Sequence, residues 1–400
     1  MPLKNDIVFA DHPRMLSGKY LSYGHTAMGM ASGELWCNLR TSTSLEIFSN
    51  NCIAKFSGIR LEEVELLSKQ LFQTSSKKQA KVVLKSKFLE FSFNVIMRMI
   101  VGKRYYGENV EGMEEAKRFQ DIMQELLLNL EDFLPLARIF DFQGVVRKMK
   151  LLMGKMDPLY QRLIDKRWKL RNETSQTNRE REEKTWIGTL LSLLETEPEL
   201  LSDVTKGIKS TLIGAATESS ATMEQAMSLF LNREEKMKKV QAEIDARESG
   251  KSICWMSKIS QSFISKKKKK KDLPKLTYPQ NVIDETLTLY PPTPLLVLHK
   301  SSKDCTIHGY DVPQGTMLLV HLWAMHRDPK LWADASKFMP ERFEERESQG
   351  HKWIPFGIGR RGCPGAALGR RVMGLVLGAL VQMKKVRAEI DARELGKIIC

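Results

Sequence analysis

Residues 355–365 read PFGIGRRGCPG and are the most informative segment of this 400-residue chain. Their single cysteine, Cys363, stands just before an apolar run, Gly365 to Met383, whose composition predicts a helix. The amide dipoles at a helix N-terminus favour an anion, and Arg360 and Arg361 add positive charge beside it. The segment therefore predicts a thiol that is readily held as its thiolate.

The same segment places glycines at positions 357, 359 and 362, ahead of the cysteine. Glycine takes positive φ at no steric cost, so we expect Gly357, Gly359 and Gly362 to bring the backbone close to a flat ligand. A cysteine thiolate presented to a large planar ligand is one way in which proteins hold haem iron. Taken by itself, the segment also permits the alternative of a structural cysteine in a turn.

The composition is that of a globular protein long enough to enclose a cofactor. Apolar residues make up 42% of the chain, which is an ordinary share. The cysteines are scattered, at positions 37, 52, 254, 305, 363 and 400. Because they form neither a C-x-x-C pair nor a zinc-type cluster, the sequence argues against a disulfide scaffold, covalently attached haem and a zinc site. We expect reduced surroundings.

The net charge of +15 is compatible with nucleic-acid binding, so its distribution matters. Part of the excess is one run, Lys266 to Lys271, and other basic residues alternate with glutamate, as from Arg179 to Lys184. Because no nucleic-acid-binding motif accompanies them, a solvated surface is the favoured interpretation, and we expect no nucleic-acid partner. The positive charge would still favour an acidic partner or an anionic membrane surface.

Apolar patterning predicts a mainly helical chain with a small β part. Besides the helix after Cys363, helices are expected at residues 31–49, 81–101, 113–129, 143–171, 202–231 and 278–290. Ser202 and Asp203 are the expected caps of the helix at 202–231, and Gly18 is an expected breaker in a turn-rich start. Short apolar runs separated by proline and glycine predict short strands between Thr293 and Val320.

Five residues of the opening segment, Phe356, Gly359, Arg361, Cys363 and Gly365, match the pattern F-x-x-G-x-R-x-C-x-G at every fixed position. This pattern is the haem-binding loop of the cytochromes P450, and the chain resembles that family. The resemblance implies the cytochrome P450 fold, mainly α with a small β part and incomplete here at both ends. It also implies haem b as the cofactor, bound by these loop residues, with Cys363 as the axial ligand of the iron.

Three further residues stand where members of this family contact the haem propionates. Trp36 and Arg40 form a W-x-x-x-R motif and, being four apart, share a helix face. His299 matches a position that often touches a propionate. A packed tryptophan, a surface arginine and a surface histidine are the alternatives for these residues.

The stretch Ala215 to Ser220, AATESS, resembles the family motif A/G-G-x-D/E-T-T/S, in which an acid and an alcohol relay protons to dioxygen. The resemblance assigns these catalytic roles to Glu218 and Ser219. Ala216 stands where the family has glycine, so we expect a more regular helix here. Polar residues on a helix face are the alternative interpretation.

Glu285 and Arg342 belong to two motifs, E-x-x-R and P-E-R-F, whose charged residues form an ionic triad behind the haem in the family. Position 288, where the triad's third member would stand, is Thr288. If the site is buried as in relatives, loss of one partner is expected to cost roughly 3 to 5 kcal/mol of stability.

The resemblance implies a single domain over residues 1–383, interrupted by a flexible lysine-rich insertion at 248–271. Met237 to Cys254, MKKVQAEIDARESGKSIC, recurs at the end of the chain as MKKVRAEIDARELGKIIC. Because relatives have a β-hairpin in that place, we interpret residues 384–400 as an aberrant tail that duplicates 238–254. We also expect the chain to lack the membrane anchor, the proline-rich hinge and the first strands with which relatives begin.

Sequence alone and family resemblance give different expectations for the cellular location. No apolar run approaches the roughly 18 residues of a transmembrane helix, and the first residues do not form a signal peptide. The chain alone is therefore expected to be soluble and cytoplasmic. The resemblance implies the cytosolic face of the endoplasmic reticulum membrane.

The activity that the resemblance implies is monooxygenation, in which one atom of dioxygen enters a small lipophilic substrate. Phrases such as LLVLHKSSKDCTIHGYDVPQGTMLL resemble the plant branch that includes isoflavone 2'-hydroxylases, so the substrate is expected to be a flavonoid-like or isoflavonoid-like metabolite. Electrons would come from NADPH through NADPH-cytochrome P450 reductase, docking near Arg360, Arg361, Arg370 and Arg371. The alternative is a catalytically inactive remnant of this family, haem-free or partner-binding.

Overall fold

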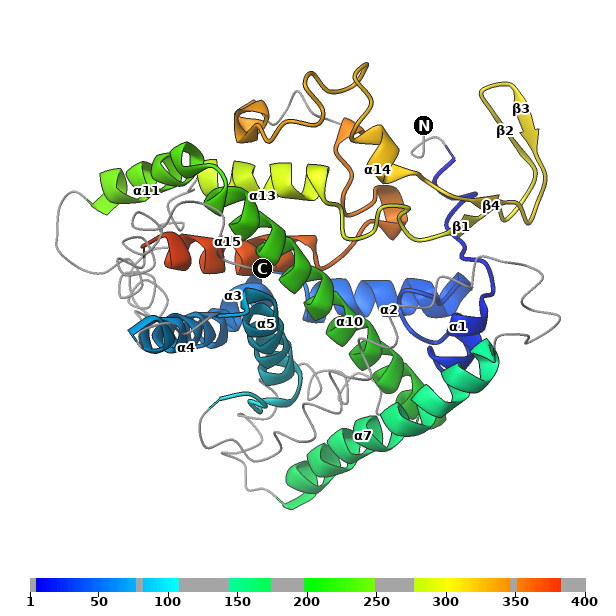
Figure 1. Cartoon of the computed structure of the whole chain (residues 1–400). Coiled ribbons are helices and arrows are strands. Elements are labelled where there is room, and N and C mark those ends of the chain that lie inside the picture. The colour runs from blue at the N-terminus through cyan, green and yellow to red at the C-terminus, as the bar shows by residue number, and fades with distance from the viewer. Residues whose placement is uncertain are drawn as a thin grey trace. The chain divides into compact units, whose positions relative to one another are not determined.

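The computed structural model describes residues 5–76, 82–107, 144–173, 198–248, 277–345 and 351–382. Within them the chain is mainly helical, with short strands in one region (Figure 1). It divides into two compact units, which are described one at a time. The first comprises Met1–Ser49, Phe93–Ala216 and Leu298–Leu318, and the second comprises Asn50–Ser92, Thr217–Val297 and Leu319–Cys400.

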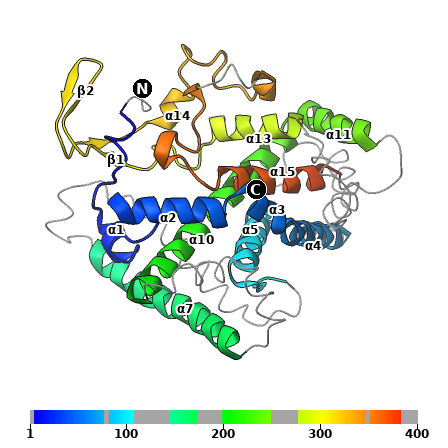
Figure 2. The ribbon, with the colours of Figure 1, turned by 180° about the vertical axis from the view of Figure 1, so that it is seen from behind.

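The first unit contains the helices α1 (Leu16–Tyr20), α2 (Gly33–Glu46) and α7 (Val145–Glu173). Helix α7 buries Met149, Leu152, Met156 and Tyr160, each at most 1% exposed. Their spacing of three or four residues places them on one face of the helix. Helix α1 packs against α7, and the two lie side by side in both views (Figures 1 and 2).

The strands of the first unit form two short antiparallel pairs. Strand β1 (His299–Lys300) pairs with β4 (Met317–Leu318), and β2 (Cys305–Ile307) pairs with β3 (Tyr310–Val312). The β2–β3 hairpin turns at His308 and Gly309, whose φ values of 50° and 85° suit a tight two-residue turn. Near the start of the chain, Asp11 forms a bridge with Lys300. The expected short strands between Thr293 and Val320 are therefore confirmed.

The second unit is built around one helix, α13. Its described elements are α3 (Asn50–Lys55), α4 (Ser57–Ser76), α11 (Glu234–Glu248), α13 (Thr277–Leu289), α14 (Leu322–Met325), α15 (Ala366–Gln382) and the 3-10 turns η3 (Pro340–Phe343) and η5 (Gly359–Arg361). Helix α13 contacts α11, α15 and η3, and every residue from Asn281 to Leu289 is buried. Helix α15 runs alongside α13 in both views and also packs on α4 (Figures 1 and 2).

Two long helices contribute to both units. Helix α5 (Leu84–Val101) begins in the second unit and ends in the first, whereas α10 (Pro198–Leu231) begins in the first and ends in the second. Helix α10 is α-helical at every position from Pro198 to Leu231. The regular helix expected from Ala216 is thus confirmed.

Two local expectations were wrong. Ser202 and Asp203 do not cap α10, because the helix starts one turn earlier at Pro198, a residue whose fixed φ suits a first turn. Gly18 does not break the chain but lies inside α1. Glycine is needed at this position for packing, because a Cβ on residue 18 would lie 2.3 Å from Cδ2 of His25.

The other helices expected in the described part of the chain are confirmed, with ends shifted by a few residues. Helix α11 was not expected, because it is largely charged and its buried apolar residues are a narrow stripe, Met237, Val240 and Ile244. The helix expected at 113–129, the insertion at 248–271 and the tail at 384–400 lie outside or almost wholly outside the described residues, and the single domain stays a prediction. Among the helices that the structure describes, none has the length and apolarity to cross a bilayer.

Candidate functional site

The cysteine loop, residues 355–365, contains η5 and ends at the start of α15. The backbone N–H of Cys363 donates to the carbonyl oxygen of Phe356 at 2.8 Å, and Gly357 N–H donates to Ile354 O at 2.9 Å. Three residues after the cysteine, α15 begins at Ala366. The side chain of Cys363 is exposed. The loop therefore presents an accessible sulfur from a backbone that is held by its own hydrogen bonds.

The glycines of this loop have two different roles. Gly357 and Gly359 have φ values of 69° and 72°, as expected. The same expectation is wrong for Gly362, whose φ is −53°. Gly362 N–H closes a turn by donating to Gly359 O at 3.0 Å, and a Cβ on Gly362 would lie 3.2 Å from that oxygen. Gly362 is thus required for close backbone approach and not for positive φ.

The surroundings of Cys363 fit a haem that is bound through sulfur. Amide groups in the first turn of α15 direct their dipoles toward the loop, which favours a thiolate over a thiol. Arg360 is exposed and Arg361 is half-buried within η5, so positive charge flanks the same position. A soft, anionic and accessible sulfur is the donor that haem iron requires in this mode of binding.

Glu218 and Ser219 lie in the part of α10 that belongs to the second unit. Desolvation of the carboxyl raises the pKa of Glu218 to about 7, although the residue as a whole is exposed. Such a carboxyl is partly protonated at neutral pH and can exchange its proton. Ser219 is half-buried, and its Oγ lies 3.9 Å from the position that a Cβ on Gly369 of α15 would occupy. Ser219 therefore faces α15, and Glu218 precedes it on the same turn of α10.

Trp36, Arg40 and His299 belong to the first unit. Trp36 is buried and Arg40 is half-buried on α2, where their spacing places them on one face. Nδ1 of His299 lies 2.8 Å from the carbonyl oxygen of Phe9, so this nitrogen carries a proton and donates it. The contact orients the imidazole on β1. The structure thus defines, within the first unit, the burial of Trp36 and Arg40 and the hydrogen bond of His299.

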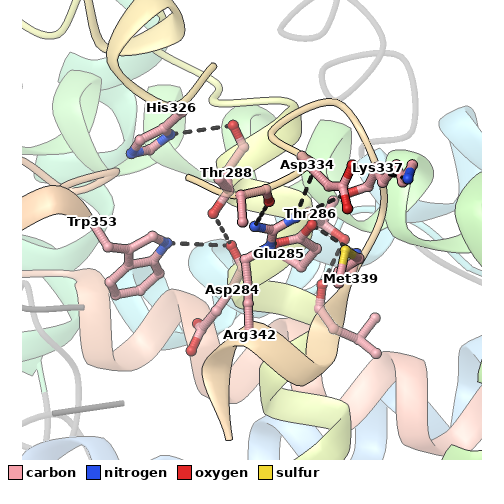
Figure 3. A network of polar contacts seen from close by, with 12 residues as sticks. Asp284, Glu285, Thr286, Thr288, His326, Asp334, Lys337, Met339, Arg342 and Trp353 are labelled. Atoms are coloured by element: carbon pink, nitrogen blue, oxygen red, sulfur yellow. Dashed lines mark hydrogen bonds and ion pairs between the residues drawn. The ribbon is translucent and has the colours of Figure 1, made fainter. Parts of the chain in front are cut away.

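Glu285 and Arg342 form a buried ion pair in the second unit (Figure 3). Oε2 of Glu285 lies 3.0 Å from Nε of Arg342, with the two side chains 0% and 10% exposed. The other carboxylate oxygen accepts the backbone N–H of Met339 at 2.8 Å. Arg342 also donates to three backbone carbonyls, those of Ala333, Asp334 and Lys337, at 2.8 to 3.2 Å. The pair fastens α13 to η3.

Thr288 occupies the place of the expected third charge without disrupting the core. It is 2% exposed, and its hydroxyl donates to the carbonyl oxygen of Asp284 at 2.8 Å. Burial raises the pKa of Glu285 to about 7, against the opposing effects of the Met339 N–H and Arg342. Because the hydroxyl is satisfied and Glu285 keeps one cationic partner, the packing around Thr288 gives no support to an inactive remnant.

Sequence reasoning missed a second ion pair on the same helix. Nη2 of Arg370, on α15, donates to Oδ2 of Asp284 at 2.6 Å, with the side chains 24% and 1% exposed. Trp353 donates from Nε1 to the carbonyl oxygen of Asp284 at 3.3 Å (Figure 3). The available signal was a second acid, Asp284, next to Glu285 in an otherwise uncharged helix.

His326 is fully buried, and its Nδ1 lies 3.2 Å from the carbonyl oxygen of Thr288 (Figure 3). Burial lowers the pKa of this imidazole to about 4, so it is neutral at physiological pH. Within the residues that the structure describes, no group of His, Cys, Asp and Glu side chains is arranged to hold a metal ion by itself. The buried and neutral His326 is therefore part of the packing of the second unit.

Comparison with known proteins places the chain in a family. The model of the family described as "Cytochrome P450" matches residues 3–392. The chain is 43% identical to cytochrome P450 81Q32 of Catharanthus roseus, over 98% of this chain and 76% of that protein. It is also 43% identical to an isoflavone 2'-hydroxylase of Glycyrrhiza echinata (95% and 73%) and 40% identical to a (+)-piperitol/(+)-sesamin synthase of Sesamum radiatum (95% and 72%).

Solved structures show the same fold. A zebrafish cytochrome P450 with abiraterone is similar with a TM-score of 0.73 and 22% identity, over 95% of this chain and 81% of that chain. A second structure, of a zebrafish cytochrome P450 with progesterone, gives a TM-score of 0.74 and 21% identity, over 96% and 83%. At this identity the likeness establishes the fold alone, and it confirms the expectation of a mainly α architecture with a small β part.

Proposed function

The chain belongs to the cytochrome P450 family, and we propose that it is a haem-thiolate monooxygenase in which Cys363 binds the iron of haem b. The observation that carries the proposal is the exposed Cys363 side chain just ahead of α15, on a backbone whose N–H donates to the Phe356 carbonyl oxygen. When bound, the haem supplies the activation of dioxygen and the transfer of one oxygen atom to the substrate.

The loop residues have separate proposed tasks in holding the cofactor. Cys363 provides the thiolate, which the helix dipole of α15 stabilises at the atom that binds iron. Gly365 keeps the start of that helix free of side chain, and Phe356 fixes the cysteine backbone through its carbonyl. Arg361, Trp36, Arg40 and His299 are proposed to bind the haem edge and its propionates, because each can present a donor or a cation.

Glu218 and Ser219 are proposed to move the protons that the reaction consumes. A carboxyl with a pKa of about 7 is protonated in a large share of molecules at neutral pH. The hydroxyl of Ser219 both donates and accepts, so it can pass a proton onward from the carboxyl. Because the residue as a whole is exposed, Glu218 is proposed to be reprotonated from solvent after each transfer.

The substrate is proposed to be a small lipophilic plant metabolite of the flavonoid or isoflavonoid class. Similarity to relatives named isoflavone 2'-hydroxylase and isoflavone 3'-hydroxylase supports this class. Electrons are proposed to come from NADPH through NADPH-cytochrome P450 reductase, at the cytosolic face of the endoplasmic reticulum. The exposed Arg360 at the cysteine loop offers positive charge to such an acidic partner.

The experiment is a turnover assay with isotopic labelling. The haem-loaded chain is incubated with an isoflavone, NADPH, plant reductase and ¹⁸O₂, and the product is analysed by mass spectrometry. We expect one labelled oxygen atom in a hydroxylated product, and none when reductase is omitted or Cys363 is replaced by serine. Unlabelled product, or labelled product that persists in Cys363→Ser, would show that the proposed chemistry is wrong.

A further inference from the structure

Asp284 connects α13 to the helix that follows the cysteine loop. Its carboxylate is 1% exposed and lies 2.6 Å from Nη2 of Arg370. Arg370 stands seven residues after Cys363, in the second turn of α15. A carboxylate so deeply buried is costly without a cationic partner, so the pairing constrains where α15 lies on α13.

The same residue also holds the segment before the cysteine. The carbonyl oxygen of Asp284 accepts Nε1–H of Trp353 at 3.3 Å, and Figure 3 shows the indole directed at that oxygen. The Trp353 ring packs edge-on against Phe356 with centroids 6.4 Å apart. Phe356 in turn accepts the backbone N–H of Cys363 at 2.8 Å. Asp284 thus supports the cysteine loop from its N-terminal side as well.

Trp353 and Arg370 complete the connection between the two sides. The guanidinium carbon of Arg370 lies 5.2 Å from the centroid of the Trp353 ring, which is cation–π geometry. The side chains from before and after Cys363 therefore meet each other as well as Asp284. Asp284 is thus a buried residue that contacts side chains on both sides of the cysteine loop.

This arrangement is separate from the Glu285–Arg342 pair. Arg342 fastens α13 to η3, whereas Arg370 fastens α13 to α15, the helix whose N-terminus carries the cysteine loop. With Thr288 in place of an arginine, its hydroxyl binds the same Asp284 carbonyl that Trp353 binds. Of the two buried acids of α13, Asp284 is therefore the one whose ion pair reaches the helix next to the cysteine loop.

We propose that Asp284 and Arg370 are positioning residues that fix the cysteine loop in the geometry needed for thiolate ligation. The consequence for ligation rests on the proposed function, but the effect on the loop does not. Loss of either partner is expected to loosen residues 356–363 more than the rest of the second unit. Neither residue is expected to touch substrate or the reacting atoms.

Hydrogen exchange of the full chain tests the loop directly. Asp284→Asn and Arg370→Gln are compared with the parent by mass spectrometry, using a peptide across 356–365 and, as internal reference, one from α4. We expect at least fivefold faster exchange in the loop peptide with an unchanged α4 peptide. Lys238→Gln, which removes an exposed ion pair with Glu234, is the matched control and should leave both peptides unchanged.

Two further variants keep the test decisive if a single replacement unfolds the chain. Arg370→Lys retains the cation and should restore most of the protection, and the double variant Asp284→Asn with Arg370→Gln removes both charges without leaving one buried alone. The double variant should fold and still show the faster loop exchange. Equal acceleration in the loop and α4, or an unaltered loop, would mean that the pair is merely structural and the proposal is wrong.

The spectrum of the reduced carbon monoxide complex separates this proposal from the proposed function. In a haem-loaded parent with a thiolate Soret band, the Asp284→Asn and Arg370→Gln variants should lose at least half of that band per folded molecule. A thiolate band that is undiminished in both variants overturns the positioning role. If the parent itself shows no thiolate band while the loop exchange still changes, the proposed function fails and the effect on the loop stands.

Discussion

Oε2 of Glu285 lies 3.0 Å from Nε of Arg342, and the pair forms inside the second unit although position 288 is threonine. Arg342 also donates to three backbone carbonyls in the segment before η3, and Glu285 accepts one backbone N–H. The position of a further arginine is filled by Thr288, whose hydroxyl is bound within its own helix. The core around α13 is thus held by the Glu285–Arg342 and Asp284–Arg370 ion pairs together with contacts to backbone groups.

Removal of Arg342 is expected to destabilise the chain strongly. Arg342→Met leaves Glu285 buried without its cation, and the free energy of unfolding should fall by about 3 to 5 kcal/mol. Urea denaturation followed by circular dichroism measures the change. Lys337→Met is the control, because Lys337 pairs with Asp334 at the surface and should contribute less than about 1 kcal/mol. Equal losses in the two variants would contradict the importance of the buried pair.

Stability should decrease as the pH rises through neutrality because of Glu285. Its folded pKa of about 7 lies above its ordinary value of 4.5, so the folded chain binds this proton more tightly than the unfolded chain. The contribution is complete below about pH 4.5 and is lost as the pH rises through 7, with a size of about 3 kcal/mol. Urea titrations at pH 5 and pH 8 measure it. The difference between the two pH values should shrink in Glu285→Gln; an unchanged difference would rule out this carboxyl as the source.

His326 should impose the opposite dependence on the acidic side. Burial lowers its pKa to about 4 from 6.5, so the unfolded chain takes up the proton first. Its contribution is complete above about pH 6.5 and is lost as the pH falls toward 4. His326→Asn retains a donor for the Thr288 carbonyl and should flatten the acid limb of the stability curve. The exposed His351→Asn serves as control, and an acid limb equally flattened by both variants would refute the assignment.

Glu218 should determine the pH dependence of turnover. With a pKa of about 7 the carboxyl loses its proton as the pH rises through neutrality, so the rate should fall above that pH. Glu218→Gln is expected to reduce turnover by about 100-fold and to remove the inflection, with haem content unchanged. Glu224→Gln on the same helix is the matched control. An inflection that survives in Glu218→Gln would assign the proton step to another group.

Local patterns were sufficient to predict most helices and the cysteine loop. Apolar spacing of three and four residues marked α7 and α13, and the run after Cys363 marked α15. The loop could be recognised because its glycines, arginine and cysteine are close together in sequence. The backbone conformation of Gly362 could not be predicted, because it depends on a turn that the N–H of Gly362 closes with the carbonyl oxygen of Gly359.

Contacts between distant segments could not be predicted. Asp284 and Arg370 are 86 residues apart, and nothing in either helix specifies that their faces meet. The close approach of His25 to Gly18 likewise depends on a chain reversal that composition does not encode. Contacts such as these depend on how distant segments pack together. The residue pattern within one helix does not specify which other segment it will contact.

Ligation of haem iron by Cys363 is the central claim, and the reduced carbon monoxide difference spectrum tests it most directly. The chain is loaded with haem, reduced with dithionite and exposed to carbon monoxide, beside Cys363→Ser and the control Cys305→Ser. We predict a thiolate-type Soret band in the parent and in Cys305→Ser, and its loss in Cys363→Ser. No such band in the parent, or the same band in Cys363→Ser, would contradict the account.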